Sequence, residues 1–148
     1  MKFSNKIYSK AVFLLIFVGI LYACDDPKPN DLLPERDVNV VVDINLPLYQ
    51  DLLIPSGYAF TPVTAEFGLQ GIVIVNLNSR YVAFDRACPH MALNDCSPMS
   101  FNYPLLKCNC DNATFNLLDG GTSSDVDFQA REYHVEVING SQLRITNY

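Results

Sequence analysis

The sequence predicts a small all-β domain, an antiparallel sandwich or barrel, over residues 38–148. Three observations lead to this prediction. Several short runs are rich in β-branched and aromatic residues, and some alternate between apolar and polar positions. An Asn-Gly pair separates two such runs near the C-terminus, which is the strongest hairpin signal that a short stretch carries. No long apolar pattern with the 3.6-residue period of a helix follows the first two dozen residues.

The expected strands are short and separated by turn-forming residues. In chain order they are residues 38–44, 72–75, 81–84, 115–118, 133–137 and 143–146. Asn78 and Ser79 suit the turn of the first hairpin, and Asn139-Gly140 suits that of the last. A single helical turn is expected at residues 51–54, because Pro55 prevents its continuation.

The first two dozen residues have the pattern of an export signal. Three lysines precede an apolar stretch at residues 11–21, which is too short for an ordinary membrane-spanning helix. The stretch ends in Leu21-Tyr22-Ala23-Cys24, which resembles the lipobox of bacterial lipoproteins, although Tyr22 is bulkier than the usual residue. This resemblance implies that Cys24 carries a lipid. The alternative is a plain cleaved signal followed by an incidental cysteine.

The sequence therefore divides into three parts. Residues 1–23 are the expected signal peptide, residues 24–37 a lipidated cysteine with a flexible tether, and residues 38–148 one folded domain. The tether is expected because residues 25–36 contain three prolines, mixed charges and few apolar residues. The protein is expected in the bacterial cell envelope, held by its lipid on a membrane outside the cytoplasm, at the periplasmic face or the cell surface.

Composition excludes several classes of function. The formal charge of −6 becomes −9 once the three signal lysines are removed, so no basic face for nucleic acid is expected. The chain has no Gly-x-Ser-x-Gly elbow, no His-Glu-x-x-His motif and only two histidines. These observations do not favour a stand-alone catalyst.

The chemistry-bearing residues gather in two boxes that fall in predicted loops. The boxes are Cys88-Pro89-His90 followed by Cys96, and Cys108-Asn109-Cys110-Asp111. Thiolates beside an imidazole suit an iron–sulfur or zinc site. Outside the cytoplasm the same four thiols could form two disulfides, and sequence alone leaves three pairings open.

The boxes resemble those of the Rieske [2Fe–2S] family, whose clusters are held by two cysteines and two histidines. Cys88 and His90 match the family's first ligand pair, and Cys108 matches the third ligand. Asp111 stands where the family has its second histidine. The resemblance implies a [2Fe–2S] cluster bound by Cys88, His90, Cys108 and Asp111.

The resemblance extends over residues 38–148 and implies a Rieske-like fold with two cysteine-bearing loops. It also implies a disulfide between Cys96 and Cys110, which match an extra pair that many members carry. Residues 122–128 occupy the position of a loop that often covers the cluster in the family.

Two features favour a domain without a cluster. Asp111 is a hard anionic donor, and replacing a neutral imidazole with it favours the ferric state and lowers the potential. The signal has lysines but no Arg-Arg pair, so the chain is expected to cross the membrane unfolded and without a cluster. Because Cys88 and Cys108 would ligate the same iron, they are expected to close a second disulfide in an oxidising compartment.

Zinc held by Cys88, His90, Cys108 and either Cys110 or Asp111 is a third interpretation. The spacing does not favour it, because it is not that of a zinc ribbon.

Two functional hypotheses follow. In the first, the chain is a membrane-anchored Rieske-like ferredoxin that passes single electrons to a redox partner through a [2Fe–2S] cluster. In the second, it has no cofactor and is a disulfide-stapled Rieske fold that acts as a structural or partner-binding module in the envelope. Phe101-Asn102-Tyr103 is a candidate partner surface, with packing of these rings over the loop as the alternative.

Overall fold

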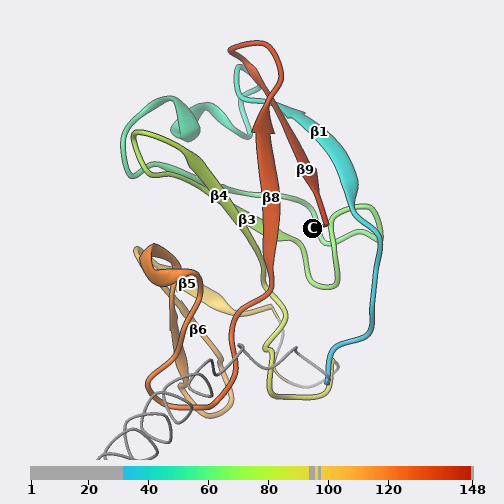
Figure 1. The fold of residues 1–148 in the computed structure, drawn as a ribbon, viewed down its shortest axis with the longest axis vertical. Helices are drawn as coiled ribbons and strands as arrows, with labels where there is room; N and C mark the ends of the chain where they lie inside the picture. Colours follow the sequence, from blue (N-terminus) through green and yellow to red (C-terminus); the bar gives the residue numbers. More distant parts are fainter. Residues whose placement is uncertain (1–31, 94–95, 97, 148) are drawn as a thin grey trace, which may run out of the picture.

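The computed structural model describes residues 32–93, 96 and 98–147, and within them the fold is almost entirely β. It contains a six-stranded sheet with the strand order β1-β9-β8-β4-β3-β2 and a three-stranded sheet with the order β5-β6-β7. Figure 1 shows the large sheet above the small one, joined by the chain that leaves β4 and the chain that returns to β8. All strand pairs are antiparallel, so the predicted fold class is confirmed.

The strands are short, as the sequence predicted. The large sheet contains β1 (Asn39–Asp43), β2 (Tyr58–Phe60), β3 (Ile72–Asn76), β4 (Tyr81–Asp85), β8 (Glu132–Val137) and β9 (Gln142–Thr146). The small sheet contains β5 (Ser100–Asn102), β6 (Leu105–Lys107) and β7 (Thr114–Asn116). Two 3-10 turns, η2 (Gln50–Leu53) and η3 (Leu117–Asp119), accompany them.

Both predicted hairpins form. β3 pairs with β4, and β8 pairs with β9. Asn78 has a φ of 69° and Gly140 a φ of 69°, which is the left-handed conformation that tight hairpin turns use. The predicted helical turn is η2, one residue earlier than expected. Asparagine and glycine thus carried the correct local signal at both hairpins.

The strand expected at residues 115–118 is wrong in its second half. β7 ends at Asn116, and the chain then turns into η3. The Asn116 side chain accepts a hydrogen bond from the backbone N–H of Leu118 at 3.0 Å, and Gly120 follows with a φ of 62°. Side-chain capping of this kind competes with strand pairing. The three-residue strands β2, β5 and β6 were not predicted, because each is too short to show a period.

The core lies on both faces of the central hairpin. Every residue of β3 is buried, which explains why its first four residues are continuously apolar and do not alternate. Val73 and Val75 belong to a cluster that includes Phe84, Phe115 and both cysteine loops. The opposite face packs in a second cluster with members Ile72, Ile74, Ala83, Tyr133, Leu143 and Ile145. The first cluster joins the two sheets and places the cysteine loops against the core.

The start of the described chain contacts the domain near the first cysteine loop. Leu33 is buried and packs against Leu69 and Ala87. The Arg131 guanidinium donates hydrogen bonds to the carbonyl oxygens of Pro34 and Leu33 at 2.9 and 3.2 Å. The predicted signal and Cys24 lie outside the described residues. No helix within the described ranges is long and apolar enough to cross a membrane.

Candidate functional site

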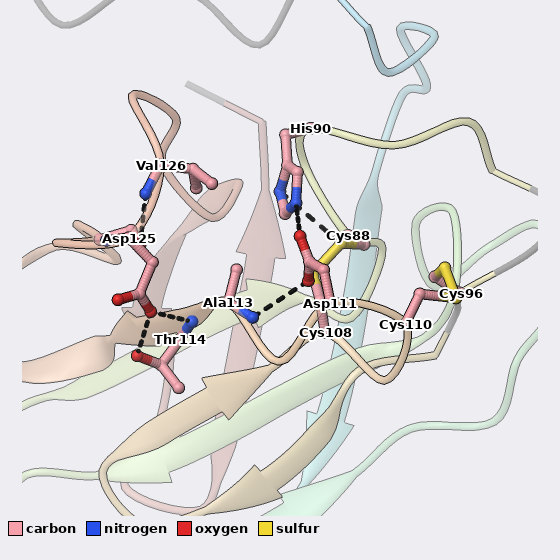
Figure 2. A network of polar contacts seen from close by, with 11 residues as sticks. Cys88, His90, Cys96, Cys108, Cys110, Asp111, Ala113, Thr114, Asp125 and Val126 are labelled. Carbon is pink, nitrogen blue, oxygen red and sulfur yellow. Dashed lines mark hydrogen bonds and ion pairs between the residues drawn. A yellow bond between two sulfur atoms is a disulfide. The ribbon is translucent and has the colours of Figure 1, made fainter.

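Two loops from different strands converge to form the site. The first follows β4 and carries Cys88, His90 and Cys96, while the second lies between β6 and β7 and carries Cys108 and Cys110. The loops meet because β4 and the small sheet share one apolar cluster. Figure 2 shows the side chains of both loops facing one another.

Two disulfides join these loops. Cys88 bonds to Cys108, and Cys96 bonds to Cys110. The Cα atoms are 5.7 and 5.5 Å apart, within the usual range for disulfides. We call Cys88–Cys108 the inner pair and Cys96–Cys110 the outer pair. These are the pairings that the hypothesis without a cluster names.

The inner pair is buried and the outer pair lies nearer to solvent. Cys88 and Cys108 are 1% and 0% exposed, and both belong to the apolar cluster between the sheets. Cys96 is buried at the margin of that cluster, and Cys110 is exposed. The two pairs therefore bridge the same loops in different environments.

His90 links the inner pair to the second loop. Its Nδ1 lies 3.8 Å from Sγ of Cys88, and its Nε2 lies 2.6 Å from Oδ2 of Asp111. The hydrogen bond to His90 is the main reason that the pKa of Asp111 is held below its ordinary value, and the backbone N–H of Ala113 adds to the effect. The arrangement is a chain of contacts from carboxylate to imidazole to sulfur (Figure 2).

The second loop fixes the Asp111 side chain. Its Oδ1 accepts a hydrogen bond from the backbone N–H of Ala113 at 3.0 Å, and its Oδ2 contacts His90. Asn112 has a φ of 67°, and the backbone N–H of Cys108 donates to the carbonyl of Ala113 at 2.9 Å. The loop is therefore tight, and both carboxylate oxygens of Asp111 already have partners.

The structure brings together three of the four predicted cofactor ligands. The candidate ligand atoms of Cys88, His90 and Cys108 all lie within 4.8 Å of one another. Asp111 contacts the other nitrogen of the His90 ring, Nε2, and not the nitrogen that faces the sulfur. His134, the second histidine, lies in β8 and does not belong to this group.

A [2Fe–2S] cluster does not fit this arrangement of donors. A Rieske cluster needs two thiolates on one iron and two further protein ligands on the other. Here the two sulfur atoms are joined to each other, and the described residues supply one imidazole at the site. The carboxylate that stands at the fourth position is bonded to the imidazole.

Asp85 positions the first loop and was not among the predicted site residues. Asp85 is fully buried at the end of β4, where its carboxylate accepts hydrogen bonds from four donors. The donors are the backbone N–H groups of Leu69 (2.7 Å), Gln70 (3.2 Å) and Ala87 (2.8 Å) and the hydroxyl of Tyr133 (2.7 Å). Burial and the neighbouring carboxylate raise the pKa of Tyr133, which therefore remains a hydroxyl donor. An acidic residue ending an apolar strand just before a cysteine box was the available signal.

The residues around His90 and the covering loop complete the site. The rings of Phe115 and Phe128 each lie 6.0 Å from the imidazole. In the loop at residues 122–128, the Asp125 carboxylate accepts hydrogen bonds from the backbone N–H and the hydroxyl of Thr114 at 2.8 and 2.9 Å. His90 is thus enclosed by aromatic rings on the core side and by Asp111 on the solvent side.

An aromatic cluster spans the two sheets away from the sulfur atoms. The rings of Tyr58 in β2 and Phe101 in β5 are 4.8 Å apart in an edge-to-face arrangement, and Tyr103 extends the cluster. The guanidinium of Arg86 lies 4.3 Å above the ring of Phe60. Tyr58 and Tyr103 are 39% and 38% exposed, so this aromatic cluster, which includes Phe101 and Tyr103 of the predicted partner surface, is partly packed and partly open.

Comparisons with known proteins give matches among solved structures. No family model matches the sequence, and no curated protein matches it. One solved match is the ferredoxin of carbazole 1,9a-dioxygenase from Nocardioides aromaticivorans IC177, with 17% identity and a TM-score of 0.47, covering 77% of this chain and 100% of the ferredoxin. Another is the apo form of a quaternary ammonium Rieske monooxygenase, CntA, with 21% identity and a TM-score of 0.46, covering 76% of this chain.

The chain spans 33% of the monooxygenase chain. That protein is named as a Rieske protein, the family that the two boxes resemble. Both TM-scores lie below 0.5, and neither likeness decides the function.

Proposed function

We propose that this protein is a disulfide-stapled Rieske-like domain without a cluster, held at a membrane surface of the bacterial cell envelope by a lipid on Cys24. It acts as a rigid module that binds a protein partner. In this proposal the four cysteines of the domain stabilise the fold, and the ancestral ligand site carries no [2Fe–2S] group.

The observation that carries this proposal is the inner disulfide. With Cys88 bonded to Cys108, neither sulfur is available as a thiolate ligand. Asp111 adds a second argument, because its carboxylate is committed to His90 and to the backbone of Ala113. An oxidising compartment, which the export signal predicts, is where such disulfides persist.

Two disulfides contribute substantially to the stability of a domain of this size. The bonded cysteines are separated by 20 residues in the inner pair and 14 in the outer pair. Restriction of the unfolded chain by loops of this length stabilises the fold by about 3 kcal/mol each. Small exported domains commonly rely on disulfides in this way.

The aromatic cluster is the proposed partner surface. Tyr58 and Tyr103 combine an apolar ring with a polar hydroxyl, a property that makes tyrosine frequent at protein interfaces. Edge-to-face packing on Phe101 holds these rings in place, so little side-chain entropy is lost on binding. Replacing Tyr58 and Tyr103 by serine is expected to abolish capture of the envelope partner, while Val137→Ser, an exposed control at the end of β8, leaves capture unchanged.

The experiment that tests the absence of a cluster uses the full-length chain, purified anaerobically in mild detergent. Iron content and the visible absorption spectrum are measured, and thiols are alkylated before and after reduction and located by mass spectrometry. We expect no iron, no visible absorption, and alkylation of all four domain cysteines only after reduction.

The competing function is electron transfer through a [2Fe–2S] cluster. It is favoured by the proximity of the Cys88, His90 and Cys108 ligand atoms, which lie within 4.8 Å of one another. About two irons per chain with visible absorption would establish that function. Alkylation of Cys88 and Cys108 in unreduced protein would likewise overturn the proposed inner disulfide.

The membrane anchor has its own test. Cys24→Ala removes the proposed lipid attachment site, so mass spectrometry should find an acylated N-terminal peptide in the wild-type chain and none in the variant. An unmodified Cys24 in the wild-type chain would contradict the lipid anchor and leave the disulfide proposal standing.

A further inference from the structure

We infer that reduction of the inner disulfide converts this site into a binding site for a single zinc ion, with Cys88, His90 and Cys108 as ligands and Asp111 as the residue that orients His90. The inference rests on the disulfide-stapled state proposed above. The domain would then have two states, one closed by a disulfide and one closed by a metal ion.

Donor spacing fits one ion better than a two-iron cluster. Zinc–sulfur bonds of about 2.3 Å and zinc–nitrogen bonds of about 2.0–2.1 Å at a tetrahedral angle place a sulfur and a nitrogen on one ion roughly 3.6 Å apart. Sγ of Cys88 lies 3.8 Å from Nδ1 of His90. In a Rieske cluster these two atoms bind different irons, so bridging sulfides hold them further apart.

The ligand types also match. Two thiolates and one imidazole, with a water completing the tetrahedron, form one of the ligand sets that zinc accepts. Soft sulfur donors with nitrogen select zinc over magnesium or calcium, which prefer oxygen. The three ligand atoms lie within 4.8 Å of one another before any ion is bound.

Asp111 occupies a position typical of a supporting residue in zinc sites. Histidines that bind metals usually donate their other ring N–H to a carboxylate, which fixes the tautomer and the orientation of the ring. Oδ2 of Asp111 lies 2.6 Å from Nε2 of His90, so that Nδ1 faces the sulfur (Figure 2). The residue that is poorly suited as an iron ligand is therefore well placed to orient a zinc ligand.

The surroundings of the inner pair are apolar on the core side and partly exposed on the side of His90 and Asp111. The cysteines are almost fully buried, and Phe115 and Phe128 flank the imidazole. The side chains of His90 and Asp111 are 10% and 35% exposed, so an ion reaches the sulfurs from their side. While the disulfide is closed, its sulfurs are poor donors and His90 alone cannot retain the ion.

Conversion of the inner disulfide into the zinc site needs a two-electron reductant. A dithiol reductant gives two electrons and two protons to the inner disulfide and becomes a disulfide itself. The two thiols then lose their two protons as they bind Zn²⁺, which gives a neutral zinc dithiolate. Rotation of the two cysteine side chains supplies the greater sulfur–sulfur separation of roughly 3.8 Å that a tetrahedral ion requires.

The test measures zinc binding by the full-length chain carrying Cys24→Ala, so that Cys24 adds no thiol. Binding is measured by competition with a chromophoric chelator, before and after reduction with a phosphine, and Co²⁺ serves as a spectroscopic probe. We expect no zinc bound by the oxidised chain and one zinc per reduced chain. The Co²⁺ form should show sulfur-to-metal charge transfer and the strong visible bands of a tetrahedral site.

Matched variants locate the site. Cys96→Ser/Cys110→Ser should retain one zinc per reduced chain, and Cys88→Ser/Cys108→Ser should lose it. Asp111→Asn should keep the Co²⁺ charge-transfer bands and lower the zinc affinity by about 10–100-fold, the usual effect of losing such a supporting residue. His90→Ala, which keeps both cysteines, should alter the Co²⁺ spectrum itself.

Several results would overturn the inference. These are equal zinc binding by oxidised and reduced chains, no zinc bound by a reduced chain that remains folded by circular dichroism, and loss of binding in the outer-pair variant. If the reduced chain unfolds without metal, one equivalent of zinc must refold it, and failure to do so counts against the site.

Failure of the proposed function is separable from failure of the zinc site. Iron or free domain thiols in the isolated chain contradict the proposed function. A chain that is iron-free and bridged, yet takes up no zinc on reduction, contradicts the zinc site alone.

Discussion

The inner and outer disulfides join the same two loops and differ in what surrounds them. The outer pair, Cys96–Cys110, ends at an exposed residue, whereas Cys88 and Cys108 lie in the core beside His90. The loops that they close differ by six residues, from separations of 20 and 14, which changes the chain entropy by only a few tenths of a kcal/mol. Any larger difference in behaviour must come from the environment of the sulfurs.

The different environments show how the same two loops can hold one disulfide that only stabilises the fold and another that lies within a ligand site. The outer pair restricts the unfolded chain, whereas the imidazole of His90 lies against Cys88 of the inner pair. The inner pair adds a histidine, a carboxylate and an apolar enclosure, which are the components of a ligand site. Asp85 lies close to the inner pair, because it accepts a hydrogen bond from Ala87, the residue before Cys88.

The largest expected effect is the difference in the free energy of unfolding that is lost when each disulfide is removed. Cys88→Ser/Cys108→Ser should lower the free energy of unfolding by about 4–5 kcal/mol, since about 3 kcal/mol of loop entropy is joined by the burial of two hydroxyls. Cys96→Ser/Cys110→Ser should lose about 3 kcal/mol or less. Denaturant unfolding followed by circular dichroism measures both, and equal losses would mean that burial does not distinguish the pairs.

The next effect concerns the support of the inner pair. Asp85→Ala leaves the donors of Leu69, Ala87 and Tyr133 without their buried acceptor, so a loss of about 3 kcal/mol is expected. Tyr133→Phe removes one neutral donor and should lose about 1–2 kcal/mol. Thermal and denaturant unfolding measure these values, and a loss below that of Tyr133→Phe would refute the role given to Asp85.

A smaller effect is expected in the order of reduction. The outer pair should open about tenfold faster than the inner pair under limiting reductant, because an attacking thiolate reaches exposed Cys110 more easily. Timed alkylation with mass spectrometry reports both rates in one sample. Asp85→Ala should accelerate reduction of the inner pair more than that of the outer pair, and an inner pair that opens first would reverse the comparison.

The smallest expected effect is a pH dependence of the folding stability that arises from Asp111. Because its folded pKa lies below the ordinary value of 3.8, its contribution to stability is present above that value and is lost as the pH falls through the folded pKa. Asp111→Asn should therefore flatten the decline in stability below about pH 4. Unfolding midpoints over an acid pH series measure this effect.

His90→Gln should remove most of the same pH dependence, since the hydrogen bond to His90 is the largest cause of the lowered pKa of Asp111. Asp125→Asn is the matched control, because the pKa of Asp125 is lowered by Thr114 and owes nothing to His90. The acid dependence of stability is compared for Asp111→Asn and Asp125→Asn, each with and without His90→Gln. If His90→Gln changes this dependence equally in both variants, the contact between Asp111 and His90 has no separate effect on stability.

Local sequence patterns were sufficient to predict much of the fold. The apolar runs of β3 and β4 and the Asn139-Gly140 turn between β8 and β9 are visible in the sequence, because hairpins depend on residues close along the chain. The strands β2, β5 and β6 escaped prediction because a three-residue strand exists only through its partners. Asn116 ended β7 early through a hydrogen bond that its side-chain type allowed but did not require.

The sequence by itself determined the all-β class and the residue types of the candidate site. It placed cysteine, histidine and aspartate in two loops, with Asp111 at the position where the Rieske family, which the two boxes resemble, has its second histidine. The tertiary structure decided which cysteines bond and which ring nitrogen of His90 meets the carboxylate. Those outcomes depend on distances and directions between loops about 20 residues apart, and packing of both sheets around one apolar cluster sets them.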